Sequence, residues 1–190
     1  MENINRIRIL QAAHELFYTR GYRSATINDL ANKLGMSKKT IYLYFSSKEE
    51  IATSVVEETM KKIAELMNKS ELTQSDPLFV LRENFINSKD EFLRFSPLFL
   101  MDIQKYLPQL AVRYKQFREE RKHVIENLLV RAKELGHIKD IPIHLVMEIL
   151  HESLRALVKP DFLSSQIYSR TEVVDTFIDI FFSGIATPAK

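Results

Sequence analysis

The stretch from Ser37 to Lys48 gathers positively charged and hydroxyl side chains and contains no acidic residue. Its members include Ser37, Lys38, Lys39, Thr40, Tyr42, Tyr44 and Lys48. Ammonium and hydroxyl groups bind phosphate oxygens and the acceptor atoms at base edges, whereas an ordinary solvated helix mixes both signs of charge. The composition of this stretch therefore indicates a surface that binds nucleic acid rather than a catalytic centre.

Two short helices joined by a tight turn are expected to position these side chains. Apolar residues of the first helix recur at i, i+3, i+4 and i+7, namely Ile27, Leu30, Ala31 and Leu34. Gly35 permits the left-handed backbone that ends a helix, and Ser37 is a typical N-cap for a second helix over KKTIYLYF. This spacing predicts a helix-turn-helix, although two amphipathic helices joined by a glycine also form hairpins that bind nothing.

Four residues of the second helix are candidates for contacts with bases. Lys38 and Lys39 stand at its start, where they can reach guanine O6 and N7 or a phosphate. Thr40 can form a hydrogen bond or touch a thymine methyl group. Leu43 can touch such a methyl group or pack against the next helix.

Two capping boxes mark helix starts on either side of these residues. Thr26 precedes Asp29 by three positions, and Ser47 precedes Glu50 by three. The free N–H groups of a helix start also suit a phosphate, which makes Thr26 a further candidate. Arg20 and Arg23, at the preceding turn, suit phosphate contact or plain solvation equally well.

A longer pattern that includes this helix-turn-helix covers about the first 55 residues. The run SATINDLANKLGMSKKTIYLYFSSKEEI, preceded by ILQAAHELFYTRGY, resembles the N-terminal DNA-binding domain of the TetR family of transcriptional regulators. The resemblance implies that Tyr42 and Tyr44 contact phosphates, and that Lys48 and the helix start beside it bind one phosphate together. Tyr44 also suits partial burial in the hairpin core. Lys39 and Leu43 depart from residues common in the family, so no relative's operator sequence is expected to apply.

The composition favours an all-α chain of about nine helices, with 45% hydrophobic residues, four glycines and no cysteine. The N-terminus lacks a signal-peptide pattern, and no apolar run approaches the roughly 18 residues of a membrane span, so we expect a cytoplasmic protein. Residues 1–48 carry eight lysine and arginine residues against three acidic ones, whereas the remainder is net negative. We therefore expect a DNA-binding domain over residues 1–48 and a helical effector-binding and dimerisation domain over residues 49–190.

Turn and cap signals give the expected helix boundaries. The first helix is expected over about residues 3–19, ended by Gly21, and the fourth from residue 48 to near Asn68. The polar stretch KSELTQS is the expected loop after the fourth helix. Because that helix starts beside the DNA and ends in the next domain, it is the expected lever between them. Later boundaries follow from proline, including a helix end near Pro160.

The last two helices are apolar on more than one face, from Ile143 to Val158 and from Val173 to Ile185. In a chain this short, a second copy is the expected partner for the second face. The resemblance agrees, because members of the family dimerise through their last helices.

Aromatic residues and methionines are dense in the second domain. Most of them are expected in the core, but as a set they also describe an apolar pocket between helices, where the resembled family places its effector. The candidate pocket residues are Phe85, Phe92, Phe95, Phe99, Met101, Tyr106, Tyr114, Phe117, Met147 and His151.

The sequence also allows two functions other than that of a DNA-binding regulator controlled by a small-molecule effector. The Glu-x-x-His pairs Glu120/His123, Glu134/His137 and Glu148/His151 have the spacing by which di-iron helical bundles hold metal. The first pair lies in a charged run and the second straddles Gly136, so we expect no metal, no cofactor and no enzyme. A DNA-binding adaptor controlled by a protein partner is the other alternative. The favoured reading is a homodimeric regulator, usually a repressor in this family, that binds a near-palindromic duplex and is released by a small hydrophobic effector.

Overall fold

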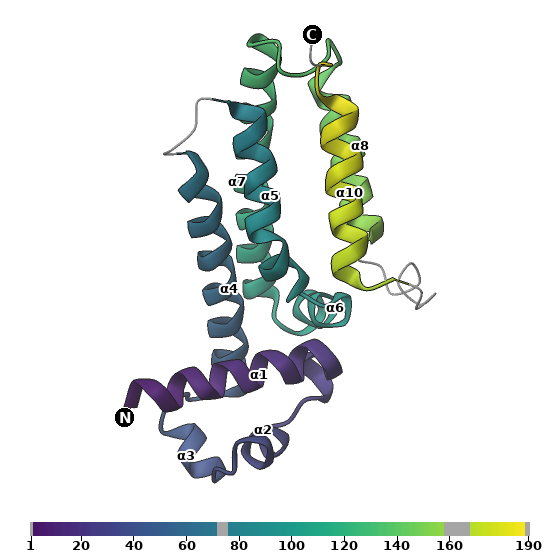
Figure 1. Cartoon of the computed structure of the whole chain (residues 1–190). Coiled ribbons are helices and arrows are strands. Elements are labelled where there is room, and N and C mark those ends of the chain that lie inside the picture. The colour runs from purple at the N-terminus through teal and green to yellow at the C-terminus, as the bar shows by residue number, and fades with distance from the viewer. Residues whose placement is uncertain (1, 72–75, 158–167, 189–190) are drawn as a thin grey trace. The chain divides into compact units, whose positions relative to one another are not determined.

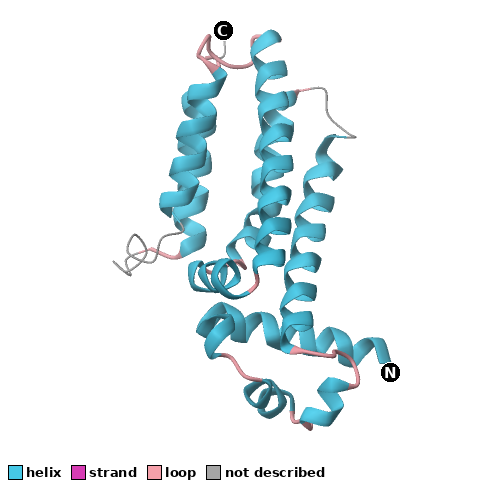
Figure 2. Cartoon of the chain, turned by 180° about the vertical axis from the view of Figure 1, so that it is seen from behind, coloured by secondary structure: helices cyan, strands magenta, loops and turns pink. Residues whose placement is uncertain are grey.

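The computed structural model describes residues 2–71, 76–157 and 168–188, and in these ranges all regular elements are helices (Figure 1; Figure 2). They are α1 (Glu2–Ser24), α2 (Ile27–Leu34), α3 (Lys38–Tyr42), α4 (Lys48–Glu71), α5 (Pro77–Leu93), α6 (Pro97–Tyr106), α7 (Pro108–Glu134), α8 (Ile143–Leu157) and α10 (Arg170–Ile185). The prediction of an all-α fold with about nine helices is confirmed.

The helices pack into two compact units. Unit 1 comprises residues 1–61 and 94–116, and unit 2 comprises residues 62–93 and 117–190. These units reflect packing, and the functional boundary expected between residues 48 and 49 stays a prediction. Each unit is described below by itself.

The core of unit 1 is built on one face of α1. The stripe of Ile9, Ala12, Ala13, Leu16 and Phe17 is buried, as the helical spacing predicts. It packs with buried Leu30 and Ala31 of α2, Ile41 of α3, and Ile51 and Val55 of α4. Helix α6 also packs against α1, where the rings of Phe17 and Phe99 stack with centroids 5.2 Å apart.

Three helix boundaries differ from expectation. Gly21 breaks the helical backbone with φ 73° and ψ 169°, as predicted, but helical turns resume to Ser24. Helix α3 ends at Tyr42 rather than continuing through KKTIYLYF, because the N–H groups of Tyr44 and Phe45 both turn back to the carbonyl of Ile41. Helix α4 runs past Asn68 to Glu71, since no glycine or proline interrupts it. The rest of the expected loop, and Pro160, lie outside the described residues.

Unit 2 has its own apolar core between α5, α7, α8 and α10. Its members include Leu81, Leu129, Met147, Leu150, Ile178 and Phe182. On α5 this packing also buries a row of polar side chains, Asn84, Ser88 and Glu91, of which Glu91 pairs with Lys62. Ile138, after the end of α7, and Ala186, after the end of α10, form an isolated antiparallel bridge.

Candidate nucleic-acid interface

Thr26 and Asp29 fix the start of α2. The Thr26 hydroxyl accepts a hydrogen bond from the Asp29 N–H at 3.1 Å, and the Asp29 carboxylate accepts one from the Thr26 N–H at 2.9 Å, which completes the predicted capping box. The bonds from the Thr26 hydroxyl and N–H lower the pKa of Asp29 below its ordinary value. Because the Thr26 hydroxyl also donates to Asp29 at 2.6 Å, a phosphate bound by that hydrogen would have to displace this bond.

The turn between α2 and α3 has the expected chemistry. Gly35 adopts φ 63° and ψ 31°, and the N–H of Met36 donates to the carbonyl of Ala31 at 3.0 Å. Ser37 caps α3 by accepting a hydrogen bond from the Thr40 N–H at 3.0 Å. Local side chains therefore hold the turn, and the angle at which α3 leaves it is set by the sequence itself.

Helix α3 separates a buried face from an exposed one. Ile41 is fully buried, whereas Lys38, Lys39, Tyr42 and Leu43 are exposed. Leu43 is 75% exposed, which excludes packing against the next helix and leaves it available for contact with a partner. Among the residues that the structure describes, neither Lys38 nor Lys39 forms an ion pair. The exposed face thus presents cations and an apolar side chain to solvent.

The two tyrosines of this region differ in their surroundings. Tyr42 is 49% exposed. Tyr44 is half-buried, and its hydroxyl oxygen accepts a hydrogen bond from the Asn5 side chain at 3.1 Å. The alternative of partial burial therefore holds for Tyr44. Asn5 had no sequence signal, because the two residues are far apart in the chain.

The start of α4 departs from the predicted capping box in one half. The Ser47 hydroxyl accepts from the Glu50 N–H at 3.0 Å, as expected. The Glu50 carboxylate, however, accepts from the N–H and the hydroxyl of Ser46, each at 2.6 Å, and not from Ser47. The carboxylate therefore reaches one residue further back, to both donors of Ser46. The helix start is nevertheless fixed by both side chains.

Lys48 lies against the end of α1. Its ammonium group is 3.4 Å from the carbonyl oxygen of Arg23 and 4.4 Å from the centroid of the Tyr22 ring. Burial lowers the pKa of Lys48, while attraction to Asp102 and Asp29 opposes this shift. The Lys48 ammonium group is therefore held against Tyr22 and the Arg23 carbonyl at the end of α1.

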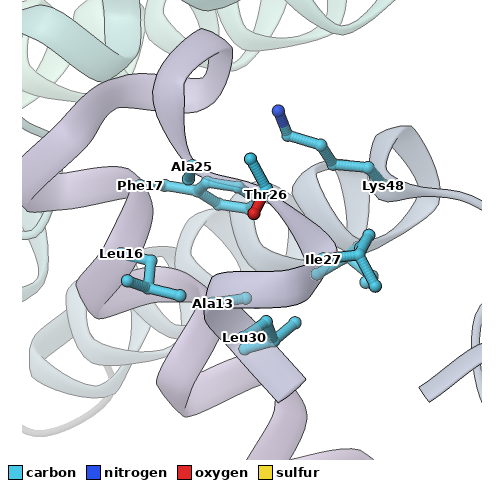
Figure 3. A pocket seen from close by; sticks show the side chains of 9 residues that line it. Ala13, Leu16, Phe17, Ala25, Thr26, Ile27, Leu30 and Lys48 are labelled. Atoms are coloured by element: carbon cyan, nitrogen blue, oxygen red, sulfur yellow. The ribbon is translucent and has the colours of Figure 1, made fainter. Parts of the chain in front are cut away.

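A small pocket connects Lys48 with Thr26 (Figure 3). Its lining residues are Ala13, Leu16, Phe17, Ala25, Thr26, Ile27, Leu30, Lys48 and Ile51. In Figure 3 the ammonium group of Lys48 points away from Ala13, Leu16 and Leu30. Lys48 and Thr26 are thus the two polar residues of an otherwise apolar lining.

Arg20 and Arg23 have protein partners. Arg20 lies 3.3 Å from the Asp29 carboxylate. The Arg23 guanidinium donates to the Tyr106 hydroxyl at 3.2 Å, and its backbone N–H donates to the Asp102 carboxylate at 2.8 Å. Neither arginine is therefore simply solvated. Tyr106, a predicted member of the effector pocket, accepts this hydrogen bond from Arg23, and its place in a pocket stays a prediction.

The other candidates for the effector pocket divide between the units. Phe95, Phe99, Met101, Tyr106 and Tyr114 belong to unit 1, and Phe85, Phe92, Phe117, Met147 and His151 belong to unit 2. Phe99 stacks on Phe17 in the core, and Met101 is 64% exposed. In unit 2, Phe85 packs edge-on against Phe182. The pocket itself stays a prediction.

Asn84 is a buried polar residue that the sequence analysis missed. It is 0% exposed, and neither its side-chain oxygen nor its nitrogen has a hydrogen-bond partner among the described residues. Ser88, one turn further on, donates to the Asn84 carbonyl. An unpaired amide in an apolar core is unusual, so Asn84 marks a place where a further polar group is needed.

The histidines of the three Glu-x-x-His pairs take partners other than those glutamates. His137 Nδ1 lies 2.6 Å from Asp76, and His151 Nε2 lies 2.8 Å from the Arg118 guanidinium. His123 is 4.0 Å from Glu126. In the described part of the chain, no three histidine or acidic side chains come together as metal ligands. The helices described are also too short or too polar to cross a membrane.

Known proteins are similar to this chain in the segment that holds α2, α3 and the turn between them. A model of the family described as "Bacterial regulatory proteins, tetR family" matches residues 9–55, which run from α1 into α4. The "Uncharacterized HTH-type transcriptional regulator YvaF" of Bacillus subtilis is 26% identical over 181 residues, with 94% of each chain covered.

Two solved structures share the fold over nearly the whole chain. The ketosteroid transcriptional regulator KstR2 of Mycobacterium tuberculosis matches with a TM-score of 0.74 at 18% identity, covering 97% of this chain and 96% of that chain. The regulator FadR of Bacillus subtilis, in complex with stearoyl-CoA, matches with a TM-score of 0.70 at 20% identity, covering 94% and 98%.

Proposed function

We propose that this chain, which belongs to the TetR family of bacterial regulatory proteins, is a transcriptional regulator that binds DNA through α3. The observation that carries the proposal is the exposed face of α3, where Lys38, Lys39, Tyr42 and Leu43 face solvent with no acidic residue among them. A helix of this kind enters the major groove, which is wide enough to admit it.

The contacts divide into two kinds by their chemistry. Lys39, Thr40 and Leu43 are proposed to meet base edges, and Lys38 meets either a base or a phosphate. Tyr42 and Lys48, together with the helix starts at Thr26 and Ser37, are proposed to hold phosphates and so fix the register on the duplex.

A homodimer is proposed to bind a near-palindrome. Leu145 and Ile149 of α8 and Ile180 of α10 are exposed apolar residues on the last two helices, and Ile180 is 69% exposed. Burying them against a second copy would form a twofold interface. Each copy would then place one α3 in the groove, with half-sites about one helical turn, or about 34–36 Å, apart.

The proposed regulatory signal is a small, fairly hydrophobic effector that binds the helical domain and releases the DNA. FadR is described in complex with stearoyl-CoA and KstR2 as a ketosteroid regulator, which supports an apolar effector here. The unpaired amide of Asn84 supports a ligand that also carries a hydrogen-bonding group. Helix α4 starts in unit 1 and ends in unit 2, so a ligand that shifts it would couple effector binding to DNA binding. The negative sign of this coupling is what the resemblance to the TetR family implies.

The test of DNA binding is selection from a random pool of duplexes by the purified protein, run beside Tyr42→Ala. Enrichment of a palindrome by the wild type, weakened in the variant, is the expected result. No enrichment by a folded protein would contradict the proposal. The selected duplex then serves in a titration with stearoyl-CoA as the first probe of the effector site.

A protein partner in place of a small molecule is the alternative signal. A panel of apolar probes that leaves both thermal stability and DNA affinity unchanged would favour this adaptor role. Release of the duplex by any one of them would favour the effector.

A further inference from the structure

Helix α6 packs closely against α1 at Gly21. A Cβ atom added to Gly21 would lie 2.6 Å from the Asp102 carboxylate and 2.9 Å from Cγ of Leu98. The φ of 73° at Gly21 is also one that other residues rarely adopt. Glycine at this position therefore lets the Asp102 side chain reach the backbone at the end of α1.

Asp102 uses this approach to bind the backbone of Arg23. The Arg23 N–H donates to the Asp102 carboxylate at 2.8 Å, and the Arg23 carbonyl accepts from the Lys48 ammonium group at 3.4 Å. One residue is thus held through its N–H by α6 and through its carbonyl by the first residue of α4. The Arg23 side chain adds a second link to α6 through the Tyr106 hydroxyl.

We propose that Asp102 is a positioning residue for DNA binding, which fixes Arg23 so that Lys48 stays in place to bind a phosphate. The inference rests on the proposed function, because it assumes that Lys48 contacts DNA. It assigns to α6 an indirect part in the phosphate contact, through Arg23 and Lys48. A movement of α6 away from α1 would release the Arg23 N–H and loosen the carbonyl that holds Lys48.

If Asp102 acted only through its charge, its removal would be expected to strengthen DNA binding. Asp102 carries a negative charge close enough to attract Lys48, and removing a negative charge near a DNA-binding lysine normally strengthens binding. If Asp102 positions Lys48, its removal must weaken binding instead. The direction of the change therefore separates the two roles.

The experiment measures the affinity of the full chain for a random-sequence duplex of about 30 base pairs, because phosphate contacts do not depend on sequence. The variants are Lys48→Ala, Asp102→Ala, Asp102→Asn and the double variant Lys48→Ala/Asp102→Ala, each over a series of salt concentrations. Leu98→Ala is the matched control, since it loosens the same α6–α1 contact and leaves the hydrogen bond of Asp102 in place. Circular dichroism checks that every variant is folded.

We expect Asp102→Ala to weaken binding by up to about tenfold and to lower the salt slope by about one, as Lys48→Ala does. In the Lys48→Ala background the same substitution should change nothing further. Asp102→Asn should retain most of the affinity, because its amide oxygen still accepts the Arg23 N–H.

Three results would overturn the inference while DNA binding stands. They are stronger binding by Asp102→Ala, equal effects of Asp102→Ala in both backgrounds, and a loss in Leu98→Ala that matches the loss in Asp102→Ala. If the wild-type chain binds no duplex, the proposed function and this inference fall together. If it binds and Lys48→Ala has no effect, only the inference and the phosphate role of Lys48 fall.

Discussion

The hydroxyl of Tyr44 is held by Asn5, at 3.1 Å, across 39 residues of sequence. The aromatic ring at the end of the α3 region is thereby tied to the first turns of α1. Tyr42, two residues earlier, is exposed. Substitutions of the two tyrosines can therefore distinguish a hydroxyl that stabilises the fold, in Tyr44, from one that is available to DNA, in Tyr42.

Tyr44→Phe is expected to lower the free energy of unfolding by about 0.5–1.5 kcal/mol, because it removes the bond from Asn5. Tyr42→Phe should leave unfolding unchanged and weaken DNA binding by a similar free energy. Urea unfolding and duplex titration measure the two effects. Equal unfolding curves for Tyr44→Phe and the wild type would show that the Asn5 contact contributes nothing.

Lys48→Ala should weaken binding to every duplex by about the same factor and lower the salt slope by about one phosphate. The reason is that its ammonium group is held at the backbone carbonyl of Arg23 and Lys48 is the first residue of α4, not part of α3. Lys115→Ala, an exposed position on α7 with the same change of charge, is the control. A sequence-dependent loss in Lys48→Ala would refute a pure phosphate role.

Lys39→Ala is expected to act differently, by relaxing the preference at particular bases. Lys39 is exposed near the start of α3, where a side chain can reach guanine acceptors. Discrimination against the wrong base should fall by about 1–3 kcal/mol at one position of the selected duplex. Binding to single-base variants of that duplex measures this, and uniform weakening would make Lys39 a phosphate contact.

Asn84→Leu should raise the free energy of unfolding by about 1–3 kcal/mol, because it replaces an unpaired buried amide by an apolar side chain of similar size. Urea unfolding gives the value, with Ser88→Ala as a neighbouring control that leaves the amide in place. The same variant should lose any stabilisation by an effector that bonds to Asn84. A less stable Asn84→Leu would mean that the amide is satisfied, for example by water.

The ion pair of Asp76 with His137 predicts a dependence of stability on pH. Burial raises the pKa of Asp76. The hydrogen bonds from His137 and from the N–H groups of Phe79 and Leu78 lower it by a larger amount, so that the pKa lies below its ordinary 3.8. A lowered folded pKa stabilises the fold above pH 3.8, and this contribution is lost as the pH falls through the folded value.

Asp76→Asn should therefore be less stable than the wild type at pH 5–7 by less than about 1 kcal/mol, since the pair is partly exposed. The two unfolding curves should converge below about pH 3.8. Asp90→Asn, at an exposed carboxylate on α5, serves as the control. A gap that persists at low pH would assign the effect to the cap of α5 alone.

The helix-turn-helix could be predicted from sequence because its determinants are local. Gly35, Ser37 and the pair Thr26–Asp29 each act within four residues of their own position, and the structure places all of them as expected. The end of α3 was missed, since KKTIYLYF has helical spacing throughout and no glycine or proline marks the turn in which the Tyr44 N–H donates to the Ile41 carbonyl.

The contacts that hold the interface in place could not be predicted in the same way. Arg23 meets Asp102 and Tyr106 across 79 and 83 residues, and no periodicity links positions so far apart. Sequence position therefore suggested phosphate contact or solvation for Arg23, and a place in the effector pocket for Tyr106. The unpaired state of Asn84 is likewise visible only once its neighbours are known.

The bridge between Ile138 and Ala186 bears on how the protein is handled. The Lys139 N–H donates to the Ile185 carbonyl at 2.9 Å, and the Thr187 N–H donates to the His137 carbonyl at 3.0 Å. These two hydrogen bonds join the end of α10 to the turn after α7. A fusion tag joined directly at Ile185 would remove the second of these bonds. A tag joined after Pro188 would leave both intact, and is the arrangement to use for expression and immobilisation.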